Sequence, residues 1–298
     1  MIGSLRRLFG NADVELPTVV GEVTPEAVGF VVRIGSTTGI RRVNQDRAVA
    51  AGPLVAVADG VGGSVRGEAA AQVALGRIMI DGALIDPHVA PAVALAALVQ
   101  SAHEQALHAR EVFNAIESST TLTVAHLCER RPTDVTPKAP TTALVDGPLV
   151  ELTLAWVGDS PAYLVDRRGV RQLTRSHTDA ADGHAAEGHP LQRAVGGSDA
   201  TPEILTEVVS GRARLVLATD GILAVPETQR TDLLADLTTT AEQCLDHLLD
   251  AVDLHGGRDN TTIAVVDLTP GTPRERTSHA WPRSSIDAPE PSFGEGDG

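Results

Sequence analysis

Short apolar runs that end at turn residues alternate with longer Ala- and Leu-rich segments along the chain. The short runs are rich in Val, Leu and Ala and are bounded by Gly, Asp and Pro, which is typical of buried strands. We therefore predict two short strands just before residue 59 and further strands over residues 28–34, 120–127, 151–157, 162–165, 170–173, 215–219 and 263–268.

The longer segments have helix-forming composition and apolar positions at helical spacing. We predict helices over residues 68–80, 87–116, 228–237 and 241–254, and a short one over 191–195. Between these elements, residues 130–148 hold four prolines and are predicted as an irregular loop, and the polar segment 174–190 is expected to be functional or mobile. Residues 1–27 are predicted to be a flexible leader and 269–298 a disordered tail, which leaves one domain over 28–268.

Composition excludes several classes of protein. Hydrophobic residues at 42% and charged residues at 21% are ordinary for a globular chain, whereas aromatic residues at 2% are too few for a base-stacking surface. The net charge of -15 opposes binding to nucleic acid. Cys128 and Cys244 are too few for a disulfide framework or a four-thiolate zinc site, which favours a reducing, cytoplasmic setting. The longest apolar stretch, Val89 to Val99, is too short for a membrane span.

Four lone carboxylates stand at the ends of predicted strands, far apart in the sequence. Asp59 ends the run Val55-Ala56-Val57-Ala58, and Asp220 ends Leu215-Val216-Leu217-Ala218-Thr219, each followed by glycine. Asp46 and Asp259 each precede an apolar stretch. A single Asp-Gly is usually only a turn. Four such acids at strand ends are what a shared metal site with oxygen ligands needs.

The chemistry of such a site is that of magnesium or manganese. These ions prefer carboxylate and carbonyl oxygens, whereas zinc would require more His or Cys ligands. Two ions about 3.5 to 4 Å apart lower the pKa of a bridging water and hold a phosphoryl oxygen, so that a phosphate ester is hydrolysed without a covalent enzyme intermediate. A nearby guanidinium group would clamp the phosphate.

The order of these motifs resembles that of the type-2C metal-dependent serine/threonine protein phosphatases, the PPM family, in its bacterial form. The resemblance covers roughly residues 28–268 and is carried by residues 41–46, 57–63, 157–160, 217–221 and 257–262. It implies an α+β fold, a four-layer α-β-β-α sandwich of two mainly antiparallel sheets flanked by helices. It also implies a binuclear manganese or magnesium site at one end of the two sheets.

The resemblance implies a role for each matching residue. Asp59 is expected to bridge two tightly bound ions, Gly60 to offer its backbone carbonyl, and Asp220 and Asp259 to be the outer ligands. Asp46 would support the site through water, and Arg41 would bind the phosphate. Asp159 matches the acid that holds a third, weaker ion, with a turn-capping role as its alternative.

The sequence also departs from the family pattern. Gln45 replaces a Glu, Val61 stands where eukaryotic members have a possible general acid histidine, and Pro161 replaces an Arg. Ser176-His177 stands where an Asp-His pair is usual, so the usual flap ligand of the third ion is missing. Two further sets of residues are expected to be solvated: Arg42, and the loop histidines His184 and His189.

The function implied is hydrolysis of phosphoserine and phosphothreonine in proteins by a metal-activated water. The partners implied are phosphorylated proteins and a cognate serine/threonine kinase. One alternative is a pseudophosphatase that binds phosphoproteins without turnover, against which the complete set of four acids argues. Another is a partner-switching phosphatase acting on an anti-sigma-factor antagonist, although no attached sensor domain is visible in the sequence.

Overall fold

A computed structural model describes residues 30–61, 65–86, 88–113, 118–130, 149–179 and 190–268. The predicted leader, the predicted tail and most of the predicted 130–148 loop lie outside the described residues. So do the histidines His184 and His189 and the glycines Gly62 and Gly63. The division into a leader, one domain and a tail therefore stays a prediction.

Two five-stranded sheets form the centre of the molecule, and every pair of neighbouring strands in them is antiparallel. The first sheet has the order β1 (Val31–Thr37), β12 (Thr261–Asp267), β11 (Arg214–Ala218), β8 (Ala162–Asp166) and β9 (Gly169–Gln172). The second sheet has the order β10 (Glu203–Ser210), β7 (Leu149–Val157), β6 (Leu122–Arg130), β3 (Leu54–Ala58) and β2 (Arg47–Ala51). A small ribbon pairs β4 (Gly60–Val61) with β5 (Ser119–Thr120).

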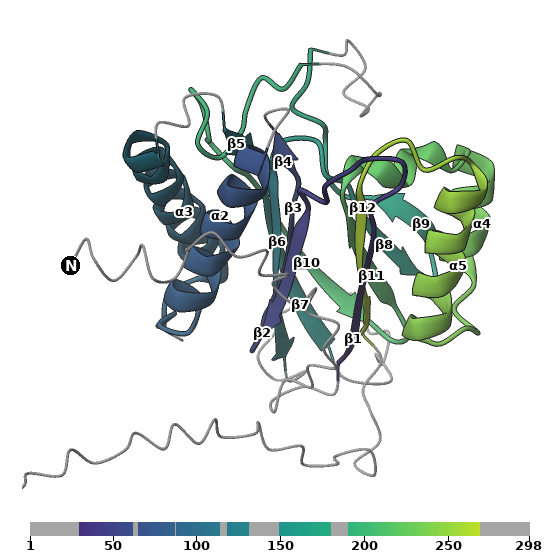
Figure 1. Ribbon diagram of the computed structural model, residues 1–298. Helices are drawn as coiled ribbons and strands as arrows, with labels where there is room; N and C mark the ends of the chain where they lie inside the picture. Colours follow the sequence, from purple (N-terminus) through teal and green to yellow (C-terminus); the bar gives the residue numbers. More distant parts are fainter. Residues whose placement is uncertain are drawn as a thin grey trace, which may run out of the picture.

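Helices cover the outer face of each sheet (Figure 1). The helices α2 (Val65–Gly82) and α3 (Pro91–Phe113) pack on the second sheet, whereas α4 (Glu227–Ala235) and α5 (Ala241–Leu254) pack on the first. A short 3-10 helix, η2 (Asp220–Ala224), follows β11. The predicted α-β-β-α sandwich is confirmed. Among the described residues, no helix is both long and apolar enough to cross a membrane.

Central strands such as β3 and β11 are apolar at nearly every position because both of their faces are covered. In β3, Val55 and Val57 belong to the core between the sheets, and the intervening Ala56 and Ala58 belong to the core beneath α2 and α3. This division follows the two-residue period of a strand. The same period in β11 places Leu215 between the sheets and Val216 against the helices. Two apolar layers therefore hold each sheet in place.

The prediction and the structure differ at three elements. The predicted helix over 191–195 is wrong, because Leu191 and Val195 instead make isolated strand-like bridges to Thr178 and Thr120. The strand β10 was not predicted. The helix predicted over 87–116 is α3, which begins only at Pro91, a residue well suited to the first turn because it lacks an N–H to satisfy.

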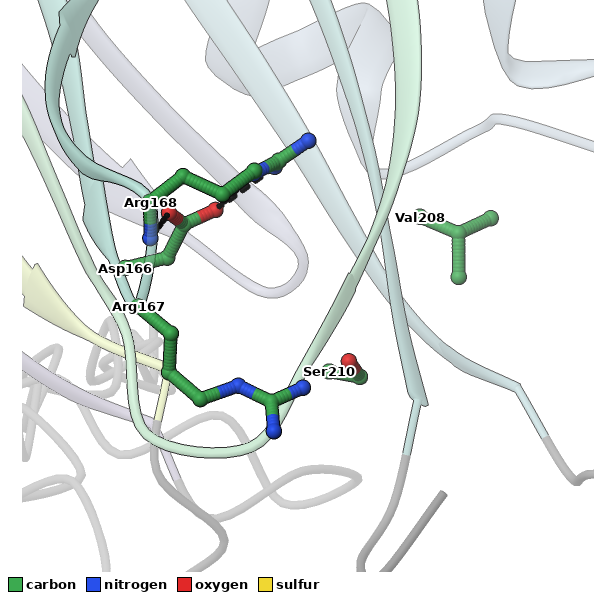
Figure 2. Close-up of a pocket in the computed structure, with 5 residues that line it drawn as sticks. All are labelled: Asp166, Arg167, Arg168, Val208 and Ser210. Atoms are coloured by element: carbon green, nitrogen blue, oxygen red, sulfur yellow. Dashed lines mark hydrogen bonds and ion pairs between the residues drawn. The ribbon is translucent and has the colours of Figure 1, made fainter. Parts of the chain in front are cut away.

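A pocket of about 250 Å³ lies at the turn between β8 and β9, against the end of β10. Figure 2 shows Arg167 extending from this turn toward Ser210. Arg168 and Arg171 each pair with Glu207 on β10, which ties the edges of the two sheets together. The pocket lies at the end of β8 away from the turn that holds Asp159, so it is separate from the predicted metal site.

Candidate metal centre

All five predicted acids lie at one end of the sandwich. Asp46 immediately precedes β2 and Asp59 immediately follows β3, and the pairing of Arg47 with Ala58 sets these two acids side by side. Asp220 follows β11 and Asp259 precedes β12, which is the antiparallel neighbour of β11. Asp159 lies in the turn after β7. The antiparallel pairing of the strands therefore brings together residues that are far apart in the sequence.

The electrostatics of these acids show that they lie close to one another. Burial raises the pKa of Asp46 to about 6, and burial followed by the charges of Asp46 and Asp220 raises the pKa of Asp59 well above its usual range. The pKa of Asp220 is raised to about 7 by burial and by the charges of Asp159 and Asp259. Burial raises the pKa of Asp159 to about 6. Such crowding of carboxylates disfavours their charged forms.

Asp46 is held by the end of β11. The hydroxyl of Thr219 donates to Asp46 Oδ2 over 2.7 Å and accepts from the backbone N–H of Thr262 over 2.9 Å. Thr219 is fully buried. Arg47 donates to the carbonyl oxygens of Asn44 and Asp46 and pairs with Glu68 on α2. The backbone and one carboxylate oxygen of Asp46 are therefore fixed.

Asp59 and Gly60 are fixed by backbone contacts. The N–H of Asp59 donates to Thr121 Oγ1 over 2.9 Å, and Thr120 Oγ1 donates to the Asp59 carbonyl oxygen over 2.8 Å. A Cβ added at Gly60 would overlap the carbonyl group of Gly67 in α2 and would lie 2.8 Å from the carbonyl oxygen of Gln45. Only glycine allows this close approach of three backbone segments.

Arg41 lies beside the predicted outer ligand Asp259. Its Nη2 donates to Asp259 Oδ2 over 2.7 Å and its Nε donates to the carbonyl oxygen of Arg258 over 3.1 Å. The side chain of Arg41 is 58% exposed, so the guanidinium also faces solvent. Asn260 supports this loop, because its side chain accepts from the N–H of Gln45 and donates to the carbonyl oxygen of Thr38. Arg42 is exposed.

The donor set suits a divalent ion that prefers oxygen. Asp46 Oδ1 and Asp220 Oδ1 are buried with no hydrogen-bond partner. Burial of such an oxygen lowers the stability of the fold unless a proton or a cation is bound to it. Within the described part of the chain, no three His, Cys, Asp or Glu side chains are already arranged as metal ligands. The charges of Asp46 and Asp220 nonetheless both raise the pKa of Asp59, which places the three carboxylates within electrostatic range of one another. The residues therefore fit manganese or magnesium.

The departures from the family pattern also have places in the structure. Val61 is 38% exposed. The hydroxyl of Ser176 is buried 3.0 Å from that of Thr178, and the ring of His177 is buried beside Gly158. Reasoning from the sequence missed the supporting roles of Thr219, Asn260, Thr121 and Gly67. A polar residue that adjoins a strand-end acid was the available signal for Thr219 and Asn260.

Similarity to known proteins agrees with this geometry. No family model matches the chain. The serine/threonine phosphatase stp of Listeria monocytogenes is 28% identical to it over 239 residues, which cover 73% of this chain and 86% of the relative. The PPM Ser-Thr phosphatase MsPP from Mycobacterium smegmatis, solved in complex with cacodylate, is 28% identical with a TM-score of 0.62, over 81% of this chain and 99% of that one.

The chain is a bacterial PPM-type phosphatase. The PPM fold extends to the crystal structure of Mycobacterium tuberculosis PstP/Ppp, which has a TM-score of 0.65 at 24% identity over 80% of this chain and 99% of that one. The full-length PstP of the same organism is 26% identical over 250 residues, which cover 78% of this chain and 44% of that protein. These matches each cover between 73% and 81% of this chain.

Proposed function

We propose that this PPM phosphatase hydrolyses phosphoserine and phosphothreonine in proteins, with two manganese or magnesium ions held by the acids at the end of the sandwich. The observation that carries the proposal is the convergence of Asp46, Asp59, Asp220 and Asp259, with Arg41 beside them. A structure of the PstP catalytic domain, 22% identical to this chain, contains two manganese ions. The partners proposed are phosphorylated proteins and a serine/threonine kinase that modifies them.

Each residue has a proposed part in holding the ions. Asp59 would bridge the two ions, the carbonyl of Gly60 would be a further ligand, and Asp220 and Asp259 would be the outer ligands. Asp159 would share a third, weaker ion with Asp220. When bound, the ions lower the pKa of a water molecule and neutralise charge on the phosphoryl oxygens.

The protein groups around the ions bind and orient the reactants. Thr219 engages Asp46 Oδ2, so Asp46 Oδ1 is the oxygen left to accept a hydrogen bond from the attacking water. Arg41 is exposed enough to turn from Asp259 to a phosphoryl group, and a guanidinium can hold two oxygens of that group at once. Arg41 therefore orients the substrate, and Asp46 orients the water.

The test is release of phosphate from a phosphothreonine peptide by the purified protein in manganese, with and without chelator. We expect turnover in manganese, none in excess chelator, and a loss of several orders of magnitude in Asp59→Asn. Undiminished phosphate release after exhaustive removal of metal would overturn the two-metal proposal. Tight peptide binding without turnover in manganese would instead favour the pseudophosphatase alternative.

A further inference from the structure

The side chain of His177 is buried next to the turn that holds Asp159. Its ring stacks on Trp156 at the end of β7, with 6.3 Å between the ring centres and 21° between the ring planes. The indole N–H of Trp156 donates to the carbonyl oxygen of Arg175, two residues before His177. Packing and this hydrogen bond together leave the imidazole little freedom to rotate.

The two ring nitrogens of His177 have different neighbours. The backbone N–H of Gly158 donates to Nδ1 over 3.1 Å, so Nδ1 is an acceptor and the proton of the neutral ring is assigned to Nε2. Nε2 lies 3.3 Å from Glu203 Oε1 on β10 and 3.5 Å from Arg193 Nη1. Burial and the charge of Arg193 lower the pKa of His177, which favours this neutral form.

Gly158 is held by His177 through both of its backbone polar groups. Its N–H donates to the ring, and its carbonyl oxygen accepts from the backbone N–H of His177 over 3.0 Å. Gly158 has a φ of 105°, and a Cβ added there would lie 2.7 Å from the side chain of Thr121. Gly158 thus adopts a backbone conformation that favours glycine, and the two hydrogen bonds with His177 hold it there.

We propose that His177 is a positioning residue of the metal centre, which holds the Gly158–Asp159 turn through Nδ1 so that the Asp159 carboxylate faces Asp220. The proposal rests on the proposed function of Asp159 as an ion ligand. Asp159 directly follows Gly158. In the same turn, the carbonyl oxygen of Pro161 accepts from the backbone N–H of Ala218 over 2.9 Å, two residues before Asp220, so the turn lies beside the end of β11 that leads to Asp220. His177 has no contact with the substrate in this role.

Two amide variants distinguish the role of Nδ1 from that of Nε2. In His177→Asn the side-chain oxygen lies near the position of Nδ1 and can still accept from Gly158, whereas in His177→Gln the amide lies near the position of Nε2. We expect His177→Gln to weaken the weaker manganese site and to lower kcat about tenfold, as groups that orient metal ligands generally do. We expect the manganese affinity of the weaker site and the kcat of His177→Asn to stay within about threefold of the wild-type values.

The measurements are manganese titration of the metal-free protein by calorimetry and, separately, kcat and KM on a phosphothreonine peptide. Glu203→Gln is the matched control, because it alters the neighbour of Nε2 and leaves the Nδ1 contact intact. A double-mutant cycle adds the decisive comparison: in an Asp159→Asn background, His177→Gln should cause no further loss. Circular dichroism and melting temperature show whether each variant is folded.

Equal losses in His177→Asn and His177→Gln, or independent losses from His177→Gln and Asp159→Asn, would overturn the inference. If His177→Gln does not fold, His177→Asn decides alone, since a folded His177→Asn that has lost the weaker site contradicts the role of Nδ1. Failure of the proposed function is distinguishable from these results, because it would show as absent turnover in the wild type. The calorimetric comparison would still decide the role of His177 in that case.

Discussion

Replacement of Asp46 by Asn should stabilise the protein when metal is removed, although it should abolish activity. Burial raises the pKa of Asp46 from 3.8 to about 6, so the folded state binds a proton more tightly than the unfolded chain does. The resulting stability is fully present below pH 3.8 and is lost as the pH rises through about 6. At pH 8 the ionised carboxylate therefore destabilises the metal-free fold.

The size of the expected stabilisation follows from the shift in the pKa of Asp46. A change of about two pKa units corresponds to roughly 3 kcal/mol, and Asn, which cannot ionise, removes that penalty. The uncharged amide also makes weaker hydrogen bonds than the carboxylate, so we expect a net gain of about 1 to 3 kcal/mol at pH 8. For a domain of this size that gain is a rise in melting temperature of about 3 to 10 °C. At pH 5, where wild-type Asp46 is mostly protonated, the difference should shrink.

The assay is thermal unfolding by circular dichroism in excess chelator at pH 8 and pH 5. Asp246→Asn, which removes an exposed carboxylate on α5, is the matched control and should change the melting temperature little at either pH. Manganese should raise the melting temperature of the wild type more than that of Asp46→Asn, because binding to the folded state alone stabilises it. A metal-free Asp46→Asn that melts below the wild type at pH 8 would refute the reasoning.

Three further predictions concern the surroundings of the centre. Arg41→Ala should raise KM for a phosphopeptide about tenfold with a smaller fall in kcat, because the guanidinium binds the substrate, whereas the exposed Arg42→Ala should change neither; the reverse result in steady-state kinetics would mean that the motif is misaligned by one residue. Gly60→Ala should lower manganese affinity measured by calorimetry, since its Cβ would overlap Gly67 and move the carbonyl; unchanged affinity would exclude that carbonyl as a ligand. Arg214→Met should lower the free energy of unfolding by about 3 kcal/mol in urea denaturation, because it leaves the partly buried acceptors on Asp267 and Thr239 without their donor; a loss below about 1 kcal/mol would show that these bonds contribute little to stability.

Local pattern was enough to predict most of the strands, the four longer helices and the acids at strand ends. It failed where stability comes from distant contacts. In the strand β10, apolar residues such as Ile204 and Val208 are exposed, whereas the acid Glu207 is partly buried and paired. The sequence of β10 therefore lacks the regular alternation of apolar and polar residues that marks a half-buried strand. Residues 191–195 have an apolar residue at each end, which contacts other segments and does not form a helical turn.

The residues that support the site could not be predicted from the sequence, because their contacts also join distant parts of the chain. The hydrogen bond from Thr219 to Asp46 joins residues that are 173 positions apart, and the bond from Asn260 to Thr38 joins residues 222 positions apart. Nothing in the local sequence of either residue specifies its partner. The acids proposed as ligands could be picked out from the sequence because chemistry, and not packing, limits which residue types can hold such ions.

The position of β12 has a consequence for how the protein is made. Among the strands that the structure describes, β12 is the last in the sequence, and it lies between β1, the first of them, and β11 in the first sheet. Asp46 and Asp59 emerge from the ribosome early. The first sheet cannot be completed, and Asp259 cannot take its place beside the other acids, until residues up to Asp267 have been synthesised. Nascent chains that stop short of β12 should therefore be unable to remove phosphate, which confines activity to completed copies of the domain.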